Sequence, residues 1–176
     1  MKNLLNKLPI PICGLILGLV SLGNLYKGIL PPIIGNIMGI IGIVLMILVI
    51  MKIVVHTKES HQALKDPIIG SVSPTFSMAL LVICTYLLPL PHMALFAKGL
   101  WILACVIQVS LVLFFNWHHV VKNTISITDV YPSWFIIFVG FGVITVTAKD
   151  FFPSVGQWFF WLSLGLYLFF LPIIIK

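Results

Sequence analysis

The chain of 176 residues is 61% hydrophobic and only 8% charged, with a mean hydropathy of +1.20. A soluble globule of this size cannot bury so much apolar surface, so we predict an integral membrane protein. The formal net charge of +6 comes from ten lysines, without any arginine, scattered between apolar runs. Such a pattern sets membrane orientation, and we expect no nucleic-acid partner.

Six apolar runs are each close to the roughly 20 residues that a helix needs to cross the hydrocarbon core of a bilayer. They are about residues 8–26, 31–55, 71–90, 94–115, 130–148 and 155–175. Because these runs are continuously apolar, whereas the strands of membrane barrels alternate, we predict an all-α polytopic membrane protein with about six transmembrane helices.

Prolines recur near the starts of three of these runs. Pro11, Pro74 and Pro132 lie about 60 residues apart, a period long enough for two membrane-crossing helices and their connections. We therefore predict a single transmembrane domain, residues 1–176, built of three repeated helical hairpins at about 8–55, 67–115 and 130–175.

The first two predicted helices both carry small residues at helical spacing. Gly14 and Gly18 share one narrow face of the first helix, and Gly35, Gly39 and Gly42 share one face of the second. Small residues let helices approach closely, and they also leave room for a conduit beside a helix; the two interpretations are not exclusive. We expect the first and second helices to pack tightly.

Polar residues inside the third and fourth runs have two alternative explanations. Ser73 and Ser77 share a face of the third helix, where their hydroxyls can bond nearby backbone carbonyls or face a polar cavity. Gln108 lies in the middle of the fourth helix. An amide there more often forms an interhelical hydrogen bond than a transport site.

The remaining polar residues do not form an enzyme centre. The four acids, Glu59, Asp66, Asp129 and Asp150, all lie at predicted helix ends, and the three cysteines show no C-x-x-C spacing. We therefore expect no catalytic residue, no metal and no cofactor. Acids and histidines are also missing from the middle of the predicted spans, where proton-driven carriers keep an ionisable relay, which favours a passive conduit over a pump.

Three sequence patches resemble a known family. They are residues 8–18, 66–76 and 131–140, which are similar in content, order and spacing to the openings of the first, third and fifth helices of the tellurite-resistance/dicarboxylate transporter family. That family includes plant slow anion channels, malate permeases and sulfite exporters. The resemblance covers nearly the whole chain.

The resemblance implies a fold of ten helices in five hairpins, with proline-kinked odd helices around a central anion pore and even helices outside. This chain looks like the N-terminal three hairpins, and the two C-terminal hairpins, with the phenylalanine that plugs the pore of the family, have no counterpart in it. The implied function is transport of small anions of the dicarboxylate, tellurite, sulfite or halide class. The alternative is a truncated, non-transporting membrane fragment or an assembly subunit.

The residues that we expect to line such a pore are prolines, glycines and serines of the odd helices. They are Pro11, Gly14, Gly18, Ser73, Pro74, Ser77, Pro132, Gly140 and Gly142. Partial charges at helix ends attract an anion without trapping it. The expected partners are the lipid bilayer, small anions, and either a separate chain that supplies the remaining helices or further copies of this chain, a trimer by the resemblance.

The lysines predict the orientation of the chain in the plasma membrane. If the N-terminus is cytoplasmic, seven lysines lie inside and three outside. The inner set is Lys2, Lys7, Lys52, Lys58, Lys65, Lys122 and Lys176, and the outer set is Lys27, Lys98 and Lys149. Because positive residues concentrate on the cytoplasmic side, we predict that both termini are cytoplasmic.

Overall fold

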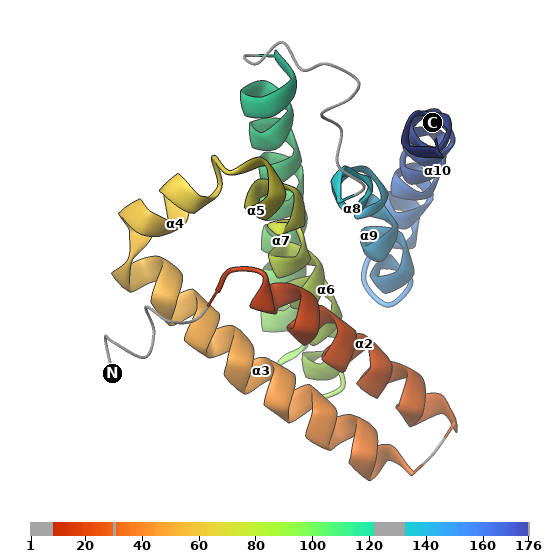
Figure 1. Cartoon of the computed structure of the whole chain (residues 1–176). Helices are drawn as coiled ribbons and strands as arrows, with labels where there is room; N and C mark the ends of the chain where they lie inside the picture. Colours follow the sequence, from red (N-terminus) through yellow and green to blue (C-terminus); the bar gives the residue numbers. More distant parts are fainter. Residues whose placement is uncertain (1–8, 30, 122–132, 176) are drawn as a thin grey trace.

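The computed structural model describes residues 9–29, 31–121 and 133–175, and all regular elements in these ranges are helices (Figure 1). The predicted all-α class is confirmed. In chain order the elements are α2 (Ile12–Ile29), α3 (Pro32–Val55), α4 (Thr57–Ala63), α5 (Pro67–Val72), α6 (Thr75–Leu87), α7 (Ala94–Phe115), a π-helical segment (Asn116–Val121), α8 (Trp134–Val139), α9 (Phe141–Ala148) and α10 (Pro153–Ile175).

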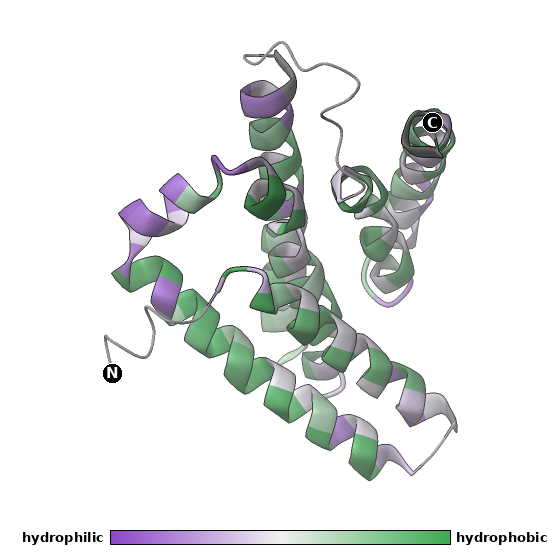
Figure 2. Ribbon diagram, in the orientation of Figure 1, coloured by the Kyte–Doolittle hydropathy of each residue, from purple (hydrophilic) through white to green (hydrophobic). Residues whose placement is uncertain are grey.

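Four helical segments of the described chain are long and apolar enough to cross a membrane: Pro32–Val55, Pro67–Leu87, Ala94–His119 and Pro153–Pro172. Two further apolar helices, Ile12–Gly28 and Trp134–Ala148, are shorter. Each of the six falls in a run where the sequence predicted a transmembrane helix, although the beginning of the fifth run lies outside the described residues. Figure 2 shows α3 hydrophobic along most of its length and α4 mostly hydrophilic.

The helices begin where local chemistry favours a start. Pro67 is the first residue of α5, and the preceding Asp66 accepts hydrogen bonds at Oδ1 from the backbone N–H groups of Ile68 and Ile69, at 2.9 and 3.0 Å. Proline costs little at this position because its missing N–H would have no helical partner. Pro11 lies in the turn before α2, so it precedes the first helix and does not kink it.

The third and fifth runs are each divided into two helices. Pro74 separates α5 from α6, and Gly140 separates α8 from α9. Proline cannot donate to the carbonyl four residues earlier, which here belongs to Gly70. The Ser73 hydroxyl donates to that carbonyl at 2.8 Å, and the Ser77 hydroxyl bonds the carbonyl of Pro74 at 2.9 Å. Of the two explanations for these serines, bonding to the local backbone is therefore found.

The helices form two layers. In the inner layer α2 packs on α6, α6 on α9, and α5 on α8; α3 packs outside α2, α7 outside α6, and α10 beside α8 and α9 (Figure 1). The first, third and fifth apolar spans (α2, α5–α6 and α8–α9) thus lie side by side. The second, fourth and sixth spans (α3, α7 and α10) each pack against their own hairpin partner. The contacts agree with odd helices inside and even helices outside, and a ring around a central pore stays an expectation.

Close glycine contacts hold the first hairpin together and attach it to the second. Gly35, Gly39 and Gly42 are all buried, and a Cβ at Gly42 would overlap the side chain of Val20 in α2. A Cβ at Gly39 would overlap the ring of Tyr86 from α6, whose hydroxyl donates to the carbonyl of Val20 at 2.8 Å. The expected tight packing of the first two helices is confirmed.

We predict opposite effects of alanine at two glycines. Gly39→Ala places a methyl group into the Tyr86 ring, and overpacking of this kind destabilises by about 1–3 kcal/mol. Gly99→Ala, in α7, meets no atom within 4 Å and gains about 1 kcal/mol of helix propensity. The measurement is the midpoint of thermal unfolding in detergent, which should fall for Gly39→Ala and stay or rise for Gly99→Ala. Equal midpoints would contradict the close contact with Tyr86.

Candidate functional site

A polar cavity of about 560 Å³ lies where α2, α6 and α9 end. All of its lining residues come from these three helices and the turns that follow α6 and α9. Its polar members are Ser21, Asn24, Lys27, Thr85, Thr147, Lys149 and Asp150. We call this space the polar cavity. It is lined only by the odd spans, which are the first, third and fifth apolar spans, and by the turns that follow them.

Hydrogen bonds hold three polar side chains of the cavity. Asn24 of α2 donates from Nδ2 to Oγ1 of Thr85 in α6 at 2.7 Å, and the Thr85 hydroxyl donates to the carbonyl of Val82 at 2.7 Å. Thr147 of α9 accepts from Nε1 of Trp101 at 3.0 Å. The first bond joins α2 to α6 and the last joins α9 to α7, so the walls of the cavity are held by specific contacts.

Two lysines dominate the charge of the polar cavity. The three helices that line it point their carboxyl ends toward it, and these ends carry partial negative charge. Lys27 and Lys149 oppose that charge, and Asp150 is the one acid in the lining. Nζ of Lys27 lies 3.5 Å from the centroid of the Tyr86 ring, a cation–π contact that holds the ammonium group beside the cavity. The two lysines therefore offset much of the negative charge that Asp150 and the helix ends bring to the cavity.

An open strip of small residues leads along α2 toward this cavity. Gly14, Gly18 and Ser21 fall on one face of the helix, and Ser21 already lines the cavity. A Cβ built at Gly14 or Gly18 meets no atom within 4 Å. Within the described chain this face is therefore not a packing surface, and we call it the α2 strip.

Other expected pore residues lie between helices. Ser77 is fully buried and hydrogen-bonds Oε1 of Gln108 in α7, so the interhelical bond expected of Gln108 is confirmed. A Cβ at Gly140 would overlap Met78 and come within 2.8 Å of Nε2 of Gln108. That nitrogen is buried and has no hydrogen-bond partner in the described residues. Ser77, Gln108 and Gly140 thus form one buried cluster between α6, α7 and the α8–α9 junction.

The remaining expected residues are dispersed. Ser73 and Pro74 are buried at the α5–α6 junction, and Gly142 faces Oγ of Ser163 in α10, 3.4 Å from a built Cβ. Pro11 is exposed before α2, and Pro132 lies outside the described residues. The structure therefore groups Gly14 with Gly18 and Ser77 with Gly140, in two separate places. A role in lining a pore stays a prediction for all nine.

The sequence analysis missed the polar cavity as a site. Asn24, Thr85 and Thr147 each lie within about two turns of the end of an odd span, and Lys149 directly follows the last of them. Aligning the three hairpins by their ends instead of by their prolines would have placed these residues at the same level. The repeat therefore contained the information needed to predict the cavity. The prolines, however, mark the N-terminal ends of the odd spans, whereas the cavity lies at their C-terminal ends.

The profile named SLAC1, described as voltage-dependent anion channel, matches residues 7–176. Searches of the curated proteins and of the solved structures found no match.

The buried cluster around Gln108 predicts an asymmetry between two substitutions. Ser77→Ala leaves the Gln108 amide without any partner, which costs about 1–3 kcal/mol. Gln108→Met removes the same bond but also removes the unpartnered N–H group, so we expect little loss or a small gain in stability. Unfolding by denaturing detergent, followed by circular dichroism, measures both. A larger loss for Gln108→Met than for Ser77→Ala would show that the Nε2 group has a partner in the folded protein.

Proposed function

Since the chain belongs to the SLAC1 family of voltage-dependent anion channels, we propose that its odd spans, α2, α5–α6 and α8–α9, form one wall of a pathway for small anions. The family is one of membrane transport proteins and not of enzymes. The proposal rests on the polar cavity. Only the odd spans and the turns after them line it, and its charged lining residues are two lysines and one acid.

The pathway runs along the α2 strip and through the polar cavity. The strip offers room because Gly14 and Gly18 have no side chains and no close neighbours. The cavity offers attraction through Lys27 and Lys149, which are offset by Asp150 and by the carboxyl ends of the helices. Lysines whose charge is offset in this way suit conduction, because an anion must enter a site and also leave it.

Passive flow fits the positions of the charged groups better than coupled transport. The acids of the described chain, Glu59, Asp66 and Asp150, lie in α4 or in connections between helices. A proton-coupled carrier places such groups within the spans. The lysines of the cavity recognise charge rather than one geometry, so the proposed substrates are small anions of the dicarboxylate, tellurite, sulfite and halide classes.

The proposed wall is closed by other helices and lies in the plasma membrane. Further helices of another chain, or further copies of this chain in a trimer, would complete the ring around the α2 strip. With both termini cytoplasmic, as the lysines predict, the polar cavity opens on the outer side, because Lys27 in the last turn of α2 and Lys149 after α9 belong to the predicted outer set.

Bulk placed on the α2 strip should stop anion flux. Gly18→Leu adds a side chain where no atom lies within 4 Å, so the helix tolerates it while the pathway narrows. The measurement is chloride or malate efflux from liposomes that contain the chain and any helices that complete it, without a proton gradient. We expect efflux near that of protein-free liposomes.

The matched control for this experiment is Gly99→Leu, which also meets open space but lies on α7. It should leave efflux unchanged. Gly140→Leu is not a clean test, because the new side chain would collide with Met78 and Gln108 and disturb the packing. Unchanged efflux in a folded Gly18→Leu variant would remove the strip from the pathway, and efflux that needs a proton or sodium gradient would indicate a coupled carrier.

Loss of one cavity lysine should slow anion flux in a salt-dependent way. A unit charge about 4 Å from an anion contributes on the order of 1 kcal/mol in a water-like dielectric, so Lys149→Gln should lower efflux about fivefold at low ionic strength. In about 1 M of an impermeant salt the Debye length falls to about 3 Å, and the difference should largely vanish. Lys98→Gln, which removes an exposed lysine outside the cavity, is the control. Equal effects of both variants would mean that only the overall charge matters.

A further inference from the structure

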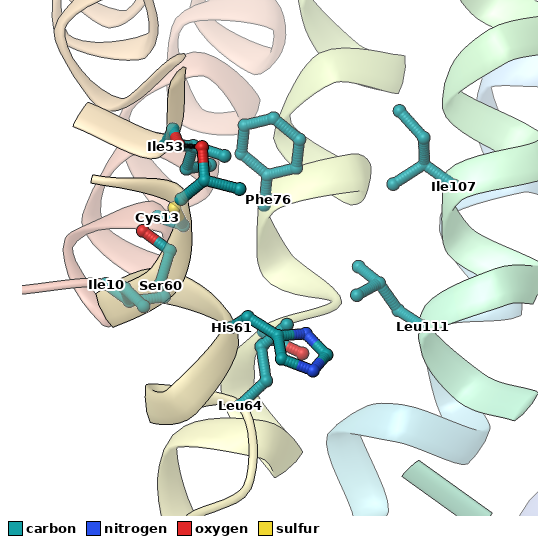
Figure 3. A pocket seen from close by; sticks show the side chains of 11 residues that line it. Ile10, Cys13, Ile53, Ser60, His61, Leu64, Phe76, Ile107 and Leu111 are labelled. Carbon is teal, nitrogen blue, oxygen red and sulfur yellow. Dashed lines mark hydrogen bonds between the residues drawn. The ribbon is translucent and has the colours of Figure 1, made fainter. Parts of the chain in front are cut away.

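A second cavity, of about 280 Å³, lies between the first and second hairpins at the end of the molecule that carries α4. Its apolar walls come from both hairpins: Ile53 of α3 and Leu64 after α4 on one side, Phe76 of α6 and Ile107 and Leu111 of α7 on the other (Figure 3). We call it the apolar cavity. It shares no lining residue with the polar cavity.

The apolar cavity adjoins surfaces that face lipid. Ile47, Ile50 and Val54 of α3 are exposed, and so are Val106 and Leu113 of α7. Such apolar surface on membrane-crossing helices lies against acyl chains. An empty apolar space beside lipid loses dispersion contacts on its lining, and an acyl chain can restore them without leaving an apolar environment.

One polar group of the lining has no partner. Ser60 of α4 is 7% exposed, and its hydroxyl has no hydrogen-bond partner among the described residues. The other lining hydroxyls are used locally: Thr57 bonds the carbonyls of Ile53 and Val54, and Ser73 bonds that of Gly70. A buried hydroxyl in an apolar space calls for an acceptor or donor on whatever fills it.

The rim of the apolar cavity is basic. Lys58, His61 and Lys65 fall at i, i+3 and i+7 along α4 and the turn after it, and His61 lines the cavity. Both lysines are exposed. Two acids adjoin these lysines in sequence: Oε1 of Glu59 is 3.5 Å from Nδ1 of His56, and Oδ1 of Asp66 accepts from the backbone N–H groups of Ile68 and Ile69. The stripe beside the cavity therefore complements an anionic group at the membrane surface.

We propose that the apolar cavity binds one anionic glycerophospholipid of the bilayer. Part of one acyl chain fills the space between Ile53 and Ile107, the Ser60 hydroxyl donates to an ester carbonyl of the glycerol backbone, and the phosphate lies against Lys58 and Lys65. Each part of such a lipid thus has a counterpart: the apolar lining for the acyl chain, the Ser60 hydroxyl for the ester and the lysines of the α4 stripe for the phosphate. This inference is independent of anion conduction.

The first test measures head-group selectivity. The full chain, stripped of lipid in detergent, is titrated with phosphatidylglycerol or with phosphatidylcholine of the same chains, and bound lipid is counted by native mass spectrometry. We expect phosphatidylglycerol to bind several-fold more tightly. Lys58→Gln with Lys65→Gln should abolish the difference, whereas Lys98→Gln, near the other end of the molecule, should keep it. Equal binding of the two lipids to the unaltered chain would overturn the proposal.

The second test asks which residues contact the acyl chain and the ester group of the bound lipid. Ile107→Phe fills the apolar cavity and should weaken binding of both lipids, while Ile102→Phe, at an exposed position of the same helix, should not. An ether-linked phosphatidylglycerol lacks the ester carbonyls, so it should bind about fivefold more weakly than the ester form, and Ser60→Ala should remove that preference. If Ser60→Ala keeps the preference, the ester contact is wrong. If oleic acid competes for the cavity as well as phosphatidylglycerol does, the site binds only an acyl chain and the proposal of a phospholipid is wrong.

Discussion

The contact of Tyr86 with the first hairpin determines how the inner layer is built. The ring lies against Gly39 of α3, the hydroxyl donates to the carbonyl of Val20 in α2, and the ammonium group of Lys27 lies over the ring. Inside a bilayer the hydrophobic effect does not drive helices together, so close packing and hydrogen bonds must do so. Because one side chain ties three helices, it also fixes the rotation of α2, which leaves the α2 strip open and brings Lys27 to the polar cavity.

Breaks in the inner helices are compatible with a membrane because hydroxyl groups satisfy the freed backbone. The hydroxyl of Ser73 donates to the Gly70 carbonyl, to which Pro74 cannot donate, and the backbone N–H of Ser73 bonds the same oxygen at 3.3 Å. At the second break, Gly140 lets the α8–α9 junction approach α6 and α7 so closely that Met78 and Gln108 occupy the place of a side chain. Local satisfaction is incomplete, because the amide nitrogen of Gln108, the indole nitrogen of Trp134 and the hydroxyl of Thr145 are buried without a partner in the described residues. Only the inner spans are interrupted in this way among the described helices.

The two cavities differ in chemistry because they lie at opposite ends of the inner helices. The polar cavity is lined by inner helices at their carboxyl ends, with lysines that offset the helix dipoles. The apolar cavity opens between α3 and α7, whose exposed faces are those that meet lipid. The proposed conduction and the proposed lipid binding therefore use opposite ends of the inner helices. A change in one cavity can be made without touching a lining residue of the other.

The sequence by itself determined the helical membrane class, the six apolar spans, the helix starts at Asp66 and the prolines, and the resemblance that the SLAC1 match confirms. These features depend on local hydrophobicity and on missing N–H groups, which neighbours along the chain suffice to specify. Only the tertiary structure decided which small residues meet other helices. Gly14 and Gly140 look alike in sequence, yet one borders open space and the other is packed against Gln108. Helical spacing defines a face, but the facing element is set by packing between hairpins distant in the chain.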